Sequence, residues 1–223
     1  GRLWGVGPAT ERRLADCGLT TVGQVAALEA GVLQAKVGRA AGAHLAALAA
    51  NRDPRAVVVG RRRRSVGSQR SFPAGSVDRD GAEQVIVEVV DRVARRLRAG
   101  ARVARTVTLR LRDAEFAQAT RSQTLPESTD RTDLILATAQ GLLSDVWPEL
   151  ERRGVTKLGV AVSNLESDDA VQLALPFASA DWGSVDQAMD EIRERFGSAA
   201  VTRATLAGRP SIEMPLLPDP PPG

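Results

Sequence analysis

Two glycines near the start of the chain, Gly5 and Gly7, stand in the run LWGVGPAT at residues 3–10. Glycine lets the backbone turn tightly and bring its amide groups close to an anion. Pro8 suits the first turn of a helix, where the free N–H groups and the positive end of the dipole attract phosphate. The sequence therefore predicts a phosphate-binding turn here. Its residues are Gly5, Val6, Gly7, Thr10 and Arg12.

The same glycine spacing also occurs in ordinary tight turns between packed helices. The longer pattern favours a helix-hairpin-helix turn, because Trp4, Leu14 and the run GLTTV at residues 18–22 fit it as well. A second run, GRAAG at residues 38–42, forms either a weaker phosphate site with Arg39 or a plain connection between helices.

Arginine supplies almost all of the positive charge. Of 30 Lys and Arg residues only Lys36 and Lys157 are lysines, and the formal net charge is +3. The arginine side chain keeps its charge and binds phosphate oxygens with two N–H groups at once, so a polyanion is a fitting partner. Residues 61–64 are four consecutive arginines, which either contact such a partner, Arg63 and Arg64 above all, or form a solvated charged surface.

A short apolar peptide lies near the C-terminal end, QLALPF at residues 172–177. Its acidic flank and its position after the last predicted strand favour an exposed peptide that fills an apolar groove on a partner. The alternative is that it packs on its own domain. The peptide residues at issue are Gln172, Leu173, Leu175, Pro176 and Phe177.

The elements that position these residues form two domains. Apolar spacing predicts a helical domain over residues 1–50, followed by a basic linker at 51–64 that contains proline and glycine. Residues 65–166 then predict the order β-α-β-β-α-β. The strands are 65–72, 103–112, 117–125 and 155–165, and the helices are 80–99 and 132–150. This α+β pattern predicts a four-stranded antiparallel sheet with both helices on one face.

The other face of that sheet carries polar residues. Val107, Leu109 and Leu111 alternate with Thr108, Arg110 and Arg112, so one side of the strand is apolar and the other cationic. In the next strand the face of Arg121 stays open, because Ala117 and Ala119 are in phase with it while Phe116 is in phase with Ser122 and Thr124. Aromatic residues make up only 3% of the chain and none is predicted on the polar face, so we expect contact with a backbone rather than stacking on bases.

Other functions find little support in the sequence. The single cysteine, Cys17, has no partner for a disulfide, and neither a membrane span nor a secretory signal is present, which together predict a cytoplasmic protein without membrane contact. We predict no catalytic residue and no metal site, since His44 and Asp168-Asp169 lack companions. Residues 167–223 are expected to be a flexible tail, with a helical segment near 185–196.

Taken together, these runs resemble the thumb and little-finger domains of bacterial Y-family translesion DNA polymerases of the DNA polymerase IV kind. The resemblance covers residues 3–177. It rests on LWGVGPATERRLADCGLTTVGQVA, on RSVG at residues 64–67, on VTLRLRDAEFAQATRSQTLPESTD and on the peptide QLALPF.

The resemblance implies partners and contacts. It implies that Ser65, Gly67 and the strand residues Arg121, Ser122 and Thr124 join Thr108, Arg110 and Arg112 in binding primer-template DNA. It also implies that the thumb lies on the minor-groove side of the duplex and the little finger on the major-groove side, and that residues 172–177 bind the bacterial beta sliding clamp.

The resemblance also implies what the chain lacks. The family's Mg²⁺-binding carboxylates belong to a palm domain whose motifs do not occur here, so we expect a monomeric fragment without cofactor that is inactive alone and derives from an error-prone polymerase acting in repair and damage tolerance. Two alternatives remain: a non-catalytic Y-family adaptor, and a helix-hairpin-helix repair scaffold unrelated to polymerases.

Overall fold

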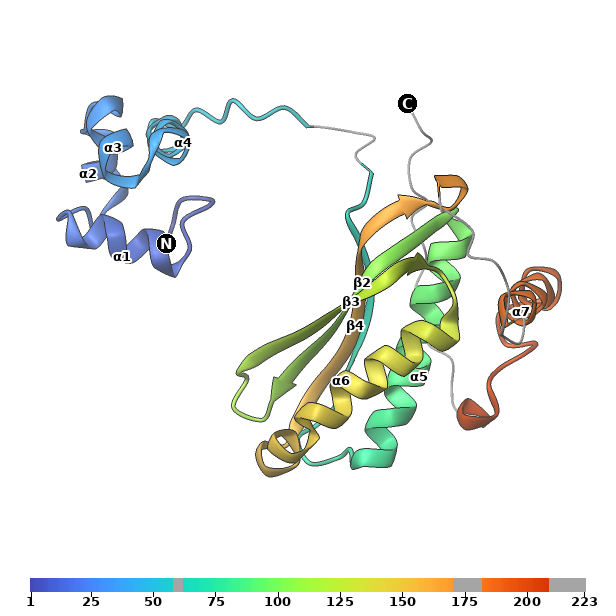
Figure 1. Ribbon diagram of the computed structural model, residues 1–223. Helices are drawn as coiled ribbons and strands as arrows, with labels where there is room; N and C mark the ends of the chain where they lie inside the picture. The colour runs from blue at the N-terminus through green and yellow to red at the C-terminus, as the bar shows by residue number, and fades with distance from the viewer. Residues whose placement is uncertain (58–61, 171–181, 209–223) are drawn as a thin grey trace. The chain divides into compact units, whose positions relative to one another are not determined.

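A computed structural model of the chain describes residues 1–57, 62–170 and 182–208. The chain forms two compact units, Gly1–Val59 and Gly60–Gly223, and their division falls within the linker expected at residues 51–64. The two units are described separately below (Figure 1).

The first unit consists of short helices around a small apolar core. The helices are α1 (Pro8–Asp16), α2 (Val22–Ala26), α3 (Ala30–Val37) and α4 (Arg39–Ala49). Helix α2 begins with a capping box, in which the Thr21 side chain accepts from the Gln24 N–H and Gln24 accepts from the Thr21 N–H. Five buried side chains form the core: Leu14, Val25, Leu33, Val37 and Leu45.

The second unit has the predicted order β-α-β-β-α-β, so the α+β prediction is confirmed. Its elements are β1 (Ser65–Ser71), α5 (Arg79–Ala99), β2 (Arg102–Asp113), β3 (Gln118–Thr129), α6 (Thr132–Arg153) and β4 (Val155–Ser167). All neighbouring strands are antiparallel, in the spatial order β1-β4-β2-β3. Helices α5 and α6 lie on the same side of this sheet (Figure 1).

The core lies between the sheet and these two helices. Val107, Leu109 and Leu111 of β2 are buried, as the alternation predicted, and Ile86 and Ile135 from the two helices are fully buried against them. Complete burial of such a side chain stabilises the fold by about 1.5–3 kcal/mol. This packing fixes which face of each strand is covered, and no described helix of the second unit lies on the opposite face of the sheet.

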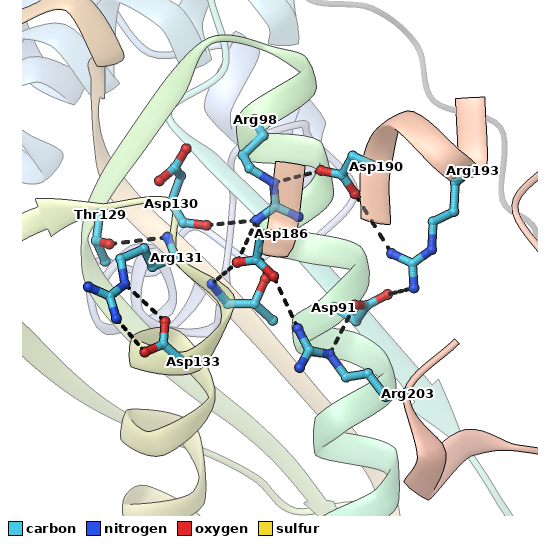
Figure 2. Close-up of polar contacts among 11 residues, drawn as sticks. Asp91, Arg98, Thr129, Asp130, Arg131, Asp133, Asp186, Asp190, Arg193 and Arg203 are labelled. Atoms are coloured by element: carbon cyan, nitrogen blue, oxygen red, sulfur yellow. Dashed lines mark hydrogen bonds and ion pairs between the residues drawn. The ribbon is translucent and has the colours of Figure 1, made fainter. Parts of the chain in front are cut away.

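The expectation of a flexible tail over residues 167–223 is wrong for part of that range. Helix α7 (Trp182–Phe196) is held against α5 by ion pairs (Figure 2). Arg98 of α5 pairs with Asp190 at 2.6 Å and with Asp186 at 3.3 Å. A second pairing joins Arg193 of α7 to Asp91 of α5 at 3.0 Å.

Charged rather than apolar side chains form the buried face of α7. Asp186 and Arg193 are buried, whereas Ile192 and Phe196 are exposed. Burial alone would lower the pKa of Arg98, but its hydrogen bond to Asp190 and the nearby carboxylates raise that pKa. The helix is therefore attached through mutually satisfied charges, a pattern that an apolar periodicity does not predict. No helix in the described part of the chain is long and apolar enough to cross a membrane.

Candidate nucleic-acid interface

The face of the sheet opposite α5 and α6 presents four residues from each strand. In an antiparallel sheet, residues directly opposite one another point to the same side, so the register assigns them. We call these residues the open face. They are Ser65, Gly67, Gln69 and Ser71 of β1, Lys157, Gly159, Ala161 and Ser163 of β4, Thr106, Thr108, Arg110 and Arg112 of β2, and Gln118, Thr120, Ser122 and Thr124 of β3.

All charged residues of the open face are positive. Arg110, Arg112 and Lys157 are its charged residues, and none of these described positions carries a carboxylate. Arg110 is exposed and forms no hydrogen bond or ion pair with any residue that the structure describes. Arg112 donates from Nε to Thr156 Oγ1 at 3.0 Å. The open face therefore offers the guanidinium of Arg110, which no described carboxylate neutralises, to an anion.

Hydroxyl pairs lie across strands β2 and β3 beside these cations. Thr108 Oγ1 and Ser122 Oγ are 2.9 Å apart, and Thr106 Oγ1 and Thr124 Oγ1 are 3.2 Å apart. Each pair is joined by one O–H donor. Since each hydroxyl has one proton, the other proton of the Thr108 and Ser122 pair is free to donate to a phosphate oxygen. Three of the predicted residues, Thr108, Ser122 and Thr124, thus lie together on the open face.

Arg121 does not lie with them. It pairs with Leu109, whose side chain is buried in the core, so Arg121 points to the helix side of the sheet. There it lines a small cavity with Val146 and Leu150 of α6. The alternation of residues could not assign Arg121 to a face of the sheet, and the pairing register does. Arg121 and Ser122 therefore point to opposite sides of the sheet.

Strand β1 contributes the predicted residues Ser65 and Gly67 to the open face. A Cβ at Gly67 would come within 3.1 Å of Ala161 Cβ, so close strand packing also accounts for this glycine. Lys157 is an open-face cation that sequence reasoning missed. Its pairing with Arg112 identifies it, and its alternation with the buried residues Leu158, Val160 and Val162 is the signal that could have predicted it.

A second group of cations lies where residues 62–64 meet α5. Burial lowers the pKa of Arg96, and the nearby charges of Arg92, Arg63 and Arg95 lower it further. Arg96 donates to the Gly67 carbonyl at 3.0 Å, which places the group at the β1 edge of the sheet. Arg63, predicted from the arginine run, therefore has cationic neighbours from α5 that the sequence did not reveal. Arg64 is exposed beside it.

In the first unit, the predicted glycine turn is present. The Val6 N–H donates to the Leu3 carbonyl at 3.2 Å, and Gly5 has φ +82°, a value that disfavours any side chain. Gly7 is the N-cap of α1 and offers no side-chain cap, so the first N–H groups of the helix, through Thr10, are left for an outside acceptor. The Val6 side chain packs toward the core, which leaves only its backbone for an anion.

Arg12 lies one turn into α1, where its Nε donates to the Pro8 carbonyl at 3.3 Å. At the second glycine run, a Cβ on Gly42 would lie 2.5 Å from Gln34 Cα, so close packing of α3 on α4 explains that glycine. Gly38, with φ +97°, makes the turn between them. Arg39 is exposed at the start of α4. This geometry favours the plain helix connection for the two glycines.

The apolar peptide at residues 172–177 lies outside the described residues, together with all five of its predicted binding residues. Its neighbours along the chain are described: a single helical turn at Asp168–Ala170 precedes it, and α7 follows it.

Comparisons with known proteins agree on one family. Residues 63–175 match the impB/mucB/samB family C-terminal domain. The chain is 40% identical to DNA polymerase IV 2 of Mesorhizobium japonicum, an alignment that covers 92% of this chain and 52% of the relative. It is 35% identical to DNA polymerase IV of Desulfatibacillum aliphaticivorans and 33% identical to that of Moorella thermoacetica, with 92% and 91% of this chain covered and 52% and 50% of each relative. The chain spans about half the length of these curated relatives.

Proposed function

The chain belongs to the C-terminal region of the Y-family DNA polymerases of the polymerase IV kind, and from this membership we propose that it holds primer-template DNA by the sugar-phosphate backbone. The observation that carries the proposal is the open face, where Arg110, Arg112 and Lys157 stand among hydroxyl groups and no carboxylate. Such a surface neutralises phosphates and makes no demand on base identity. It suits a polymerase that must accept damaged bases.

The glycine turn before α1 supports a second backbone contact in this proposal. Free amides at a helix N-terminus bind one phosphate, and Arg12 adds charge near them. The cations around Arg96 extend the positive surface along the β1 edge. In the proposal these groups bind phosphates of the same DNA.

We further propose that residues 172–177 bind the bacterial sliding clamp. Support comes from the peptide's pattern, in which Leu173, Leu175 and Phe177 supply apolar side chains and Gln172 a polar one. The parent protein of this proposal is a Mg²⁺-dependent DNA polymerase in translesion repair. Among the described residues, no group of three or more His, Cys, Asp or Glu side chains is placed to hold a metal ion.

A matched pair of variants tests the DNA-binding proposal. Arg110→Ala and Arg121→Ala remove the same charge from neighbouring strands, but from opposite faces of the sheet. We expect Arg110→Ala to weaken binding to primer-template DNA and to lower the slope of log K against log salt by about 1. Arg121→Ala should leave both quantities near those of the unmodified chain.

The measurement is fluorescence anisotropy with labelled DNA at several salt concentrations. A flat salt response of the unmodified chain would contradict phosphate binding altogether. Equal effects of the two variants would show that the open face is not the interface and that diffuse positive charge is responsible.

A further inference from the structure

Phe116, at the turn between β2 and β3, is a large aromatic side chain held in solvent. Its side chain is 69% exposed, and its backbone has φ +64°, in the left-handed region that bulky residues rarely adopt. Glycine or asparagine would fit this position with less strain. The three-residue hairpin loop between Asp113 and Ala117 accounts for the left-handed backbone, but not for an exposed phenylalanine at this position. Strained residues of this kind concentrate at functional sites.

The turn that carries Phe116 is firmly braced. Asp113 accepts the Ala117 N–H at its Oδ1 at 2.8 Å and the Phe116 N–H at its backbone carbonyl at 3.2 Å. The Asp113 side chain is buried and pairs with Arg153 of α6 at 3.3 Å. A further hydrogen bond, from the Ala114 N–H to the Gly154 carbonyl, ties the turn to the start of β4. These contacts therefore hold in place the backbone that carries the Phe116 ring.

Phe116 also adjoins the open face. The guanidinium carbon of Arg112 lies 5.1 Å from the centroid of the ring, a cation–π distance. Arg112 is itself positioned by Thr156 and lies in the open-face row with Lys157 and Gln118. The expectation that no aromatic residue accompanies the polar face is thus wrong at this end of the sheet. By alternation Phe116 is in phase with Ser122 and Thr124, but it lies in the turn, outside the strand predicted at residues 117–125.

We infer that Phe116 is a stacking platform for an unpaired nucleobase of the DNA whose backbone lies on the open face. An exposed ring beside a cation is the arrangement with which proteins hold single-stranded nucleic acid, since every base offers a π face while the cation takes the adjacent phosphate. Inside a duplex the base faces are covered by their neighbours, so the contact selects an unpaired base, such as one in a template overhang. The inference rests on the proposed DNA-binding function.

The test compares two DNAs of equal duplex length, one blunt and one with a five-nucleotide template overhang. Phe116→Ala should weaken binding of the full chain to the overhang DNA by about tenfold, the effect typical of losing one stacked base, and should change binding to the blunt DNA by less than about twofold. Phe116→Leu should lose as much as Phe116→Ala, whereas Phe116→Trp should retain the affinity. The salt slope should stay unchanged, because no phosphate contact is removed.

The possible outcomes separate this inference from the function on which it rests. If the unmodified chain binds neither DNA, the proposed function fails and the inference fails with it. If it binds both with a steep salt dependence and Phe116→Ala binds equally well, the inference alone is overturned. Equal weakening on both DNAs, or full affinity of Phe116→Leu, would also overturn it, because the contact would then be to duplex or merely apolar. Thermal unfolding of each variant verifies that the exposed position tolerates the change.

Discussion

Asp186 of α7 accepts a hydrogen bond at 2.8 Å from the backbone N–H of Thr132, the first residue of α6. Helix α6 has no side-chain cap from its own N-cap residue, so a carboxylate distant in sequence takes that place and meets the positive end of the helix dipole (Figure 2). The same carboxylate pairs with Arg98 and with Arg203 at 3.2 Å. One side chain thereby joins α5, α6 and α7.

Removal of this carboxylate should destabilise the second unit. Asp186→Ala leaves the N-terminus of α6 without a cap and removes one of the two carboxylate partners of Arg98 and of Arg203, for an expected loss of about 1–3 kcal/mol in the free energy of unfolding. The measurement is urea denaturation followed by circular dichroism. Glu83→Ala is the control, because Glu83 pairs with Arg79 on the exposed surface and should cost less than about 0.5 kcal/mol. Similar losses for both variants would show that α7 is not anchored by Asp186.

Gly42 should be essential to the packing of the first unit. A Cβ at this position would lie 2.5 Å from Gln34 Cα, so Gly42→Ala must separate α3 from α4, at an expected cost of about 2–3 kcal/mol. The control is Gly31→Ala in α3, where an added Cβ meets no atom within 4 Å; this variant should be neutral or stabilised by up to about 1 kcal/mol. Hydrogen exchange of the α3 and α4 amides reports on this unit specifically. Unchanged exchange in Gly42→Ala would contradict the packing.

Gly7 should matter for DNA and little for stability. Its φ of −86° suits any residue, and an added Cβ would meet no atom within 4 Å. We expect the free energy of unfolding of Gly7→Ala to lie within about 0.5 kcal/mol of that of the unmodified chain. It should nevertheless bind primer-template DNA about tenfold more weakly, because the methyl group obstructs a phosphate at the amides of α1. Gly23→Ala, another unobstructed position, is the control for both measurements. If the two variants bind DNA alike, the turn is not a phosphate site.

The peptide at residues 172–177 should account for capture by a sliding clamp. The double variant Leu175→Ala/Phe177→Ala removes two apolar anchors and should lower the affinity for a purified bacterial clamp by about 100-fold or more. Val171→Ala, on the same segment, should leave that affinity unchanged, and neither variant should alter DNA binding. Surface plasmon resonance measures both. If the double variant binds the clamp as well as the unmodified chain does, the peptide is not the clamp-binding segment and packs on its own domain instead.

The sequence by itself determined the elements of the second unit. Alternation along residues 107–112 assigned the apolar side of β2, and the apolar faces of residues 80–99 and 132–150 identified the two helices that cover it. These assignments hold because the buried face of a strand or helix is a local property, which the spacing of apolar residues along the sequence shows directly. The open face and its cations Arg110 and Arg112 followed from the same rule.

The tertiary structure decided what depends on register and on contacts between distant segments. A shift of one residue moves every side chain of a strand to the other face, so only the pairing of β3 with β2 could assign Arg121 to the helix side. The braced turn sets Phe116 beside Arg112. Helix α7 packs against α5 through the ion pairs of Asp186. An apolar stripe in a sequence shows which face of a helix will be buried, whereas charged residues show it only once their partners in the folded structure are known.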